Sequence, residues 1–201
     1  MSPGADRLPN VMKVELASLR TSVEMAVAWV NVLFWPAFGR RGRVVSMMEA
    51  ERFEVSRQVT ASPSTVFAVL RDPAGHVKID SSGMLQSADG EPVSTVGDSF
   101  VVHMDREALN DYPLGQYDVT VIITEYEPDA LIEWTIGSKV NDQPLRHLYG
   151  YRLEPKGAGT RVTSYYDWSQ IPDAYRGKGI FPVIPEAALR ATLGILARTV
   201  E

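Results

Sequence analysis

The sequence predicts an α+β fold made of a seven-stranded antiparallel sheet, two short helices after its first strand, and one long C-terminal helix. Segments of alternating apolar and polar residues recur along the chain with turn residues between them, which favours hairpins and antiparallel pairing. A capped helix start follows the first of these segments. The last segment of the chain places apolar residues at helical spacing.

The first strand and the first helix are the clearest elements. Residues 53–60 alternate between a face with apolar members and a fully polar face. Ser62 is a good N-cap and Pro63 takes the favoured first helical position, so a helix is expected to run to Leu70. Asp72-Pro73 then ends this helix, and residues 74–82 are expected to hold a second small helix or turn.

Further strands and a final helix follow, separated by Gly and Pro turn signals. The strands are expected at residues 84–88, 99–105, 116–127, 130–136, 147–154 and 160–168. A helix over residues 185–200 has apolar positions at helical spacing, with Glu186 near its start and Arg198 near its end, both of which suit the helix dipole.

Three motifs carry a family resemblance. They are S-P-x-x-V-F-x-x-L-x-D-P at residues 62–73, G-Y-x-L-E-P-x-G-x-G-T-x-V-T at residues 150–163, and Y-D-W-S at residues 166–169. With the strand that precedes them, they resemble the START/Bet v 1-like (SRPBCC) superfamily, in its polyketide cyclase/dehydrase and lipid-transport group and an uncharacterised actinobacterial-type branch. The resemblance implies a helix-grip fold, in which the sheet curves around the C-terminal helix and encloses a cavity for an apolar molecule.

The chain divides into an N-terminal extension at residues 1–48 and a helix-grip domain at residues 49–201. Residues 23–38 are strongly apolar and precede Gly-Arg-Arg-Gly-Arg, but the window is short for a membrane span and contains Glu24, Asn31 and Pro36. Residues 23–43 are compatible with peripheral membrane contact. The alternatives are an amphipathic helix that packs on the domain or on a partner, and a mis-assigned start that makes the true first residue Met47 or Met48.

Composition excludes several classes of site and partner. A formal net charge of −5 argues against a nucleic-acid surface, and the lack of cysteine excludes disulfides and thiolate chemistry and is compatible with a cytoplasmic protein. The three histidines, His76, His103 and His147, have no metal-ligand spacing, so no metal is expected. No phosphate-binding glycine loop is present, so no cofactor is expected. The oligomeric state is left open.

The resemblance implies that alternate residues of the strands line the cavity. The inward set is apolar and aromatic with a few polar groups: Phe100, Val102, Tyr117, Val119, Val121, Trp134, His147, Tyr149, Tyr151, Ser164, Tyr166 and Trp168. The loop 171–185 is a candidate lid that carries Tyr175, Ile180 and Phe181. The alternative is that these aromatic residues fill a solid core and the loop is an ordinary connection.

Two functions follow from such a cavity. The first is a carrier or sensor that binds a hydrophobic small molecule such as a lipid, a polyketide or an isoprenoid-like compound. The second is a polyketide cyclase/aromatase or dehydratase, with His147, Tyr149 and Tyr151 as acid–base candidates and His76 with Asp80 in reserve. Binding is favoured because no tight acid–base constellation is legible, and His147 is also explained as a histidine hydrogen-bonded at a strand edge.

Overall fold

The computed structural model describes residues 51–107, 114–137 and 145–201. The extension expected at residues 1–48 lies outside these ranges. Within them, no helix combines the length and the apolar character that crossing a bilayer requires.

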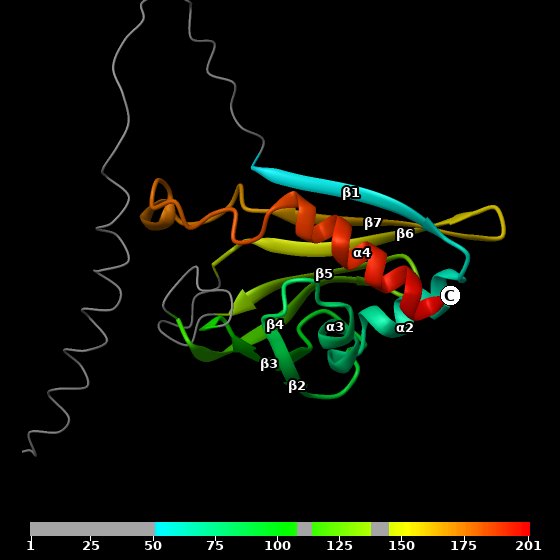
Figure 1. Ribbon diagram of the computed structural model, residues 1–201, viewed down its shortest axis with the longest axis horizontal. Coiled ribbons are helices and arrows are strands. Elements are labelled where there is room, and N and C mark those ends of the chain that lie inside the picture. Colours follow the sequence, from blue (N-terminus) through cyan, green and yellow to red (C-terminus); the bar gives the residue numbers. More distant parts are fainter. Residues whose placement is uncertain (1–50, 108–113, 138–144) are drawn as a thin grey trace, which may run out of the picture.

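The seven strands form one curved antiparallel sheet in the order β1-β7-β6-β5-β4-β3-β2 (Figure 1). This order confirms the predicted fold class, because every strand after β2 pairs with its sequence neighbour and β7 closes on β1. The bounds lie within two residues of the expected ones: β1 Arg52–Val59, β2 Leu85–Asp89, β3 Ser99–Asp105, β4 Gln116–Glu127, β5 Leu131–Gly137, β6 Leu148–Lys156 and β7 Gly159–Asp167.

Two short helices connect β1 to β2 and begin by the same local chemistry. Helix α2 (Pro63–Leu70) starts where Ser62 Oγ accepts a hydrogen bond from the Thr65 amide at 3.2 Å. Helix α3 (Pro73–Ile79) starts where Asp72 Oδ1 accepts from the Ala74 amide at 3.0 Å. Asp72-Pro73 therefore ends one helix and also caps the next, and the second small helix or turn expected at residues 74–82 is a helix that begins earlier.

The two short helices approach each other closely at Gly75. A Cβ atom built on this residue would lie 1.9 Å from the backbone oxygen of Val69 in α2. Only a residue without a side chain fits there, because the neighbour is backbone and cannot rotate away. Gly75 therefore fixes the position of α3, whose His76 and Ile79 are buried on its inner side.

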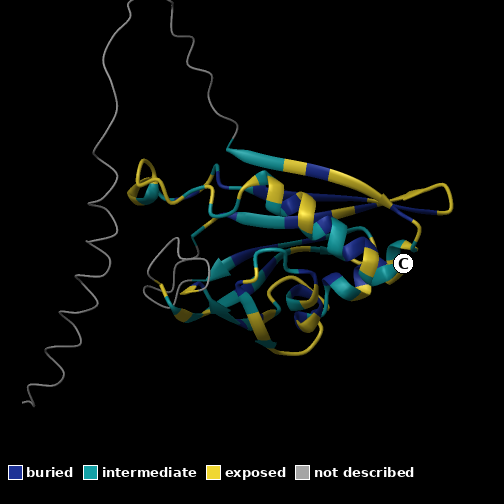
Figure 2. Ribbon diagram, viewed as in Figure 1, coloured by how far each residue is buried: buried dark blue, intermediate teal, exposed yellow. Residues whose placement is uncertain are grey.

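Helix α4 (Glu186–Val200) covers the concave face of the sheet on the β1–β7 side (Figures 1 and 2). Its buried residues, Leu189, Leu193, Leu196 and Ala197, recur at the spacing that the sequence predicts. They join a core with Val55 and Val59 of β1 and Val162 of β7. Burial of this apolar stripe holds the helix on the sheet, since the hydrophobic effect supplies most of the stability of a short surface helix.

The convex face carries an aromatic side chain inside a charged cluster. Tyr165 of β7 lies between the guanidinium groups of Arg52 and Arg152, at 4.4 and 4.7 Å from its ring centroid, and donates a hydrogen bond to Glu133 Oε2 at 2.9 Å. A Cβ atom on Gly150 of β6 would lie 2.3 Å from the Tyr165 ring. The Tyr165 ring therefore occupies the space that a side chain at Gly150 would fill.

A candidate ligand cavity

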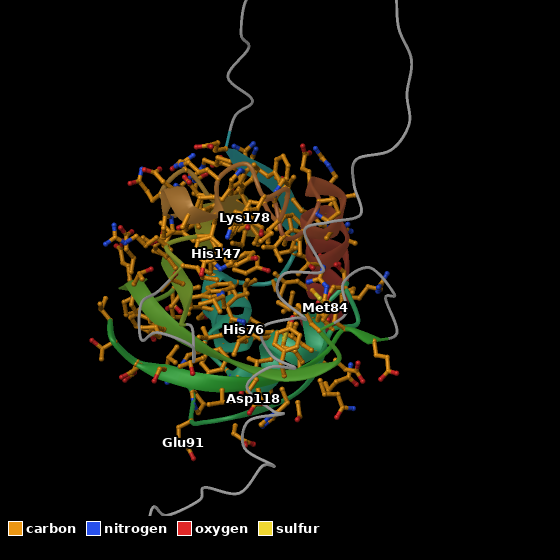
Figure 3. The ribbon with its side chains drawn as sticks, turned by 90° about the vertical axis from the view of Figure 1, so that its left-hand side faces the viewer. His76, Met84, Glu91, Asp118, His147 and Lys178 are labelled. Carbon is orange, nitrogen blue, oxygen red and sulfur yellow. The ribbon has the colours of Figure 1, made fainter. Side chains whose placement is uncertain are left out.

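A cavity of about 840 Å³ lies between the sheet, α3, α4 and the loop 168–185. This volume falls in the range of pockets that bind small molecules, roughly 300–1,000 Å³. Most of its lining is apolar, and it reaches the surface at Leu114, Lys178 and Ile180, which are exposed. We call this opening the mouth. Figure 3 views the molecule from this end, with His76 and His147 inside the ring of sheet and helix and Asp118 on its outside.

The structure places most of the sequence-predicted pocket residues on the lining. They are Val102, Tyr117, Val119, Val121, Trp134, His147, Tyr149, Tyr151 and Ser164. The other three, Phe100, Tyr166 and Trp168, are buried but are not part of the lining. Phe100 packs edge-on against His76 at 5.0 Å between ring centroids, and Trp168 packs against Phe53 at 4.7 Å.

Aromatic rings from three neighbouring strands form a ladder along one wall of the cavity. Trp134 of β5 pairs with Tyr149 of β6, and Tyr149 pairs with Tyr166 of β7. The Tyr149 and Tyr166 rings are stacked at 4.3 Å and 11°, and the Trp134 and Tyr149 rings at 6.0 Å and 18°. Such cross-strand aromatic contacts add packing energy beyond area burial and give the wall a fixed shape.

The Tyr166 hydroxyl is the hub that connects this ladder to the loop 168–185. It accepts a hydrogen bond from the Val183 amide at 3.3 Å and another from the Tyr149 hydroxyl. Its own proton is then available to His147 Nδ1, which lies 3.2 Å away. The Tyr166 hydroxyl thus joins three groups by hydrogen bonds: the Tyr149 hydroxyl, the Val183 amide and the His147 ring.

His147 is buried, with 3% of its surface exposed, and burial lowers its pKa to about 4. The ring is therefore neutral at pH 7, and the hydrogen bond from Tyr166 to Nδ1 assigns the ring proton to Nε2. Among the described residues, His147 Nε2 has no hydrogen-bond partner. The Phe181 ring packs against the imidazole at 5.3 Å between centroids.

Burial of neutral His147 predicts a pH dependence of stability. Between the ordinary pKa of 6.5 and the folded value of about 4, the unfolded chain binds more protons than the folded one, so the free energy of unfolding falls as the pH drops. We expect a lower urea midpoint at pH 5 than at pH 6.5, and a smaller difference between the two in His147→Gln. Burial also lowers the pKa of His76 to about 4, so part of the pH dependence should remain in the His147→Gln variant. An identical pH dependence in the variant would contradict this assignment.

His76 and Asp80 both line the cavity but are bonded to other groups. His76 Nε2 lies 2.7 Å from the Leu70 carbonyl oxygen, to which it donates. Asp80 accepts from the Ser82 amide and hydroxyl and from the Leu85 amide, at 2.9, 2.7 and 3.1 Å. Asp80 thus shapes the turn that follows α3. His76 and Asp80 are hydrogen-bonded to these other groups and not to each other.

Several lining residues were missed by strand periodicity because they lie outside the strands. Arg106, just after β3, is 6% exposed, and Lys178 lies in the loop 168–185. Ser81 donates to the Ala188 carbonyl oxygen and accepts from Thr192, both at 2.9 Å, which ties the α3 turn to α4. A charged residue directly after a strand is normally taken as exposed, so only the hairpin position of Arg106 could have drawn attention to it.

The candidate lid residues have different positions. Tyr175 and Ile180 line the cavity, while Phe181 lies against His147 behind the lining. Lys178 Nζ lies 5.4 Å from the centroid of the Tyr175 ring. Arg176 pairs with Glu51 at 2.6 Å and so ties this loop to the start of β1.

His103, to which the sequence assigned no role, lies on the outer face of the sheet. Its Nδ1 is 2.7 Å from Asp118 and its Nε2 is 3.0 Å from Asp89. Hydrogen bonds to Asp89 and Asp118 raise its pKa, so this contribution to stability is present at low pH and is lost as the pH rises through the raised value. Within the described ranges, no three His, Asp or Glu side chains are arranged to hold a metal ion.

Comparison with known proteins identifies the family. The model of the family described as "Polyketide cyclase / dehydrase and lipid transport" matches residues 50–201. The chain is 29% identical over 128 residues to the uncharacterized protein Rv0088 of Mycobacterium tuberculosis, which covers 62% of this chain and 51% of that protein. The chain thus spans about half the length of this curated relative.

Solved structures share the fold at low sequence identity. Protein CV1439 from Chromobacterium violaceum superposes with a TM-score of 0.54 at 20% identity, covering 75% of this chain and 97% of that one. A protein from Arthrobacter aurescens gives a TM-score of 0.55 at 18% identity, covering 76% and 87%. The family match agrees with the antiparallel sheet that packs on α4 and with the internal cavity. The chain belongs to the polyketide cyclase/dehydrase and lipid-transport family of the SRPBCC superfamily.

Proposed function

We propose that this protein binds a hydrophobic small molecule, such as a lipid, a polyketide or an isoprenoid-like compound, inside its cavity and acts as a carrier or sensor. The observation that supports this most directly is the cavity of about 840 Å³ with a mostly apolar lining and a mouth at Leu114, Lys178 and Ile180. An apolar ligand would gain by leaving water, and the flat rings of Trp134 and Tyr149 would give it a stacking surface.

Catalysis by a polyketide cyclase or dehydratase mechanism has weaker support. A general base works best when its pKa lies near the operating pH. Burial lowers the pKa of His147 to about 4, which makes its imidazole a poor proton acceptor at pH 7. Burial also raises the pKa of Tyr151 to about 12 and that of Tyr149 well above its ordinary value, so both hydroxyls stay protonated. Neutral, protonated groups of this kind suit hydrogen bonding to a ligand.

The first experiment is native mass spectrometry of the freshly purified full chain, followed by extraction and identification of any bound molecule. A co-purifying apolar compound would support the carrier or sensor function and would name the ligand class. Uptake of an uncharged fluorescent probe, N-phenyl-1-naphthylamine, measures the same cavity when the protein is empty. A protein that holds no compound and takes up no probe would contradict the proposal.

A substitution that fills the cavity tests where the ligand binds. Ala188 of α4 lines the cavity, so an indole placed there by Ala188→Trp would occupy ligand space. We expect at least about tenfold weaker probe binding, because overpacking a filled site costs on the order of 1–3 kcal/mol. Ala191→Trp is the matched control, since Ala191 is exposed on the same helix and does not line the cavity. Wild-type affinity in a folded Ala188→Trp protein would place the ligand elsewhere.

A further inference from the structure

The mouth of the cavity exposes apolar side chains to water. Leu114 and Ile180 are 55% and 37% exposed, and they are two of the three large hydrophobic residues that are exposed within the described ranges. The third, Val96, precedes β3 at the end of that strand far from the mouth. Leu114 and Ile180 also line the cavity, whose interior is mostly apolar. Exposed apolar side chains around such an entrance are typical of a surface that another apolar group covers.

The chain enters the domain beside this mouth. The Glu51 carboxylate pairs with Arg176 at 2.6 Å, and the Glu51 carbonyl oxygen accepts a hydrogen bond from the Trp168 amide at 2.9 Å. Arg176 and Trp168 belong to the loop 168–185, which borders the mouth. In Figure 1 the start of β1 and this loop lie at one end of the molecule, and the C-terminus of α4 lies at the other. The N-terminal part of the chain therefore joins the domain at the end where the cavity opens.

The part of the chain before β1 contains an apolar segment suited to this surface. Thirteen of the sixteen residues at 23–38 are hydrophobic, and Trp29, Phe34 and Trp35 are among them. We call residues 23–38 the apolar stretch. Its side chains gain free energy when they leave water. The twelve residues 39–50 that join it to the domain can span up to about 40 Å when extended, which is ample for a mouth bordered by the neighbouring loop.

Charge and connectivity favour contact between the apolar stretch and the domain. Residues 1–48 carry six basic and three acidic side chains, a formal charge of +3, so the rest of the chain carries −8. Three of the basic side chains, Arg40, Arg41 and Arg43, lie between the apolar stretch and β1. Opposite charges guide two surfaces together. Because the stretch belongs to the same chain, its local concentration at the mouth is on the order of millimolar, so a weak contact is enough.

We propose that the apolar stretch, residues 23–38, docks on the mouth against Leu114 and Ile180 and so covers the entrance of the cavity. The occupant of this apolar surface is then a segment of the same chain, and a ligand enters when that segment leaves. This inference goes beyond the proposed function, because the docking itself needs no ligand. Its effect on uptake rests on the cavity being a binding site.

The first test detects the contact without a ligand. The chain has no cysteine, so Leu114→Cys creates a single attachment site for bimane, a fluorophore that a nearby tryptophan quenches. Of the four tryptophans, Trp29 and Trp35 belong to the apolar stretch, and Trp134 and Trp168 belong to the domain. We expect the bimane emission of the labelled full chain to rise when Trp29→Phe and Trp35→Phe are introduced together, because the domain tryptophans are unchanged.

Val96→Cys is the matched control, because Val96 is as exposed as Leu114, at 55%, but lies at the other end of β3. Its bimane emission should not respond to the two tryptophan changes. Emission that does not respond at Leu114→Cys, or responds equally at both labels, overturns the inference. Quenching that grows with protein concentration also overturns it and assigns the contact to a second copy. An unresponsive mouth label together with co-sedimentation on phosphatidylcholine vesicles assigns the apolar stretch to a bilayer surface instead.

The second test measures how the docking affects uptake. Val30→Asp with Leu33→Asp places two carboxylates in the apolar stretch and leaves the described domain unchanged. If the entrance is covered about nine-tenths of the time, the variant should bind N-phenyl-1-naphthylamine about tenfold more tightly than the wild type. Val14→Asp with Leu19→Asp, the same changes outside the stretch, should keep wild-type affinity. Equal affinities in all three proteins overturn the covering role. No uptake by any of them removes the proposed function, while the bimane result still decides the docking.

Discussion

Replacing Gly75 with alanine is expected to lower the free energy of unfolding by about 3 kcal/mol or more, at the upper end of overpacking effects. The new Cβ would lie 1.9 Å from the Val69 oxygen and 2.9 Å from the Val69 carbonyl carbon, both backbone atoms of α2. Helices α2 and α3 would have to separate, and α3 would carry His76 and Ile79 out of the cavity wall. Urea unfolding followed by circular dichroism measures the loss.

Gly194→Ala is the matched control, because Gly194 is also a helical glycine. Its nearest neighbour to an added Cβ is the Arg57 Nη1 atom at 3.8 Å, an ordinary contact. Alanine there should raise stability by about 0.5–1 kcal/mol through helix propensity alone. The same chemical change is therefore expected to have opposite signs in α3 and α4. A Gly75→Ala variant as stable as the wild type, or more stable, would show that α2 and α3 do not approach as closely as the 1.9 Å distance implies.

Tyr166→Phe is expected to cost about 3 kcal/mol or more, because one hydroxyl is removed from three partners and each partner left unsatisfied costs at least about 1 kcal/mol. The Val183 amide loses its acceptor, His147 Nδ1 loses its donor and the Tyr149 hydroxyl loses its acceptor. The ring itself is retained, so no cavity forms and the loss reports on hydrogen bonds alone. The measurement is again the urea midpoint.

Tyr126→Phe provides the comparison for that loss. The Tyr126 hydroxyl donates one hydrogen bond, to the Val93 carbonyl oxygen at 3.3 Å, and is only partly buried. Its removal should cost about 1 kcal/mol, the usual value for one hydrogen bond. Equal losses in the two variants would mean that the hub at Tyr166 contributes no more than a single contact.

Local chemistry made most of the fold predictable. Ser62-Pro63 specifies the start of α2, and the Gly and Pro turns separate strands whose alternation fixes one face. Asp72-Pro73 predicts the end of the first helix, but it also starts the second, because Asp before Pro is the same pairing of N-cap and first helical residue as Ser before Pro. The seven-stranded order follows once each hairpin is recognised.

Alternation predicted the face of a strand residue but not its depth behind that face. Trp134, Tyr149 and Tyr166 share the concave side, yet the loop 168–185 covers Tyr166 through Trp168 and Val183, so Tyr166 is buried off the cavity lining while Trp134 lies on it. Which strand residues a loop covers depends on tertiary packing, which period-two patterns do not encode. The place of Arg106 on the cavity lining is not predictable for a related reason, because alternation assigns no face to a residue beyond the end of a strand.

The contact between Gly150 and Tyr165 makes one part of the cavity wall thin. Gly150 offers no side chain on either side of the sheet, and the Tyr165 ring, which lies outside between Arg52 and Arg152, fills the space that a side chain at Gly150 would take. Both residues line the cavity. The interior shape is therefore set partly from the exterior. A smaller side chain in place of Tyr165 would remove the outer support of the wall at Gly150, so the shape of the cavity can change through a side chain that lies on the outer face of the sheet.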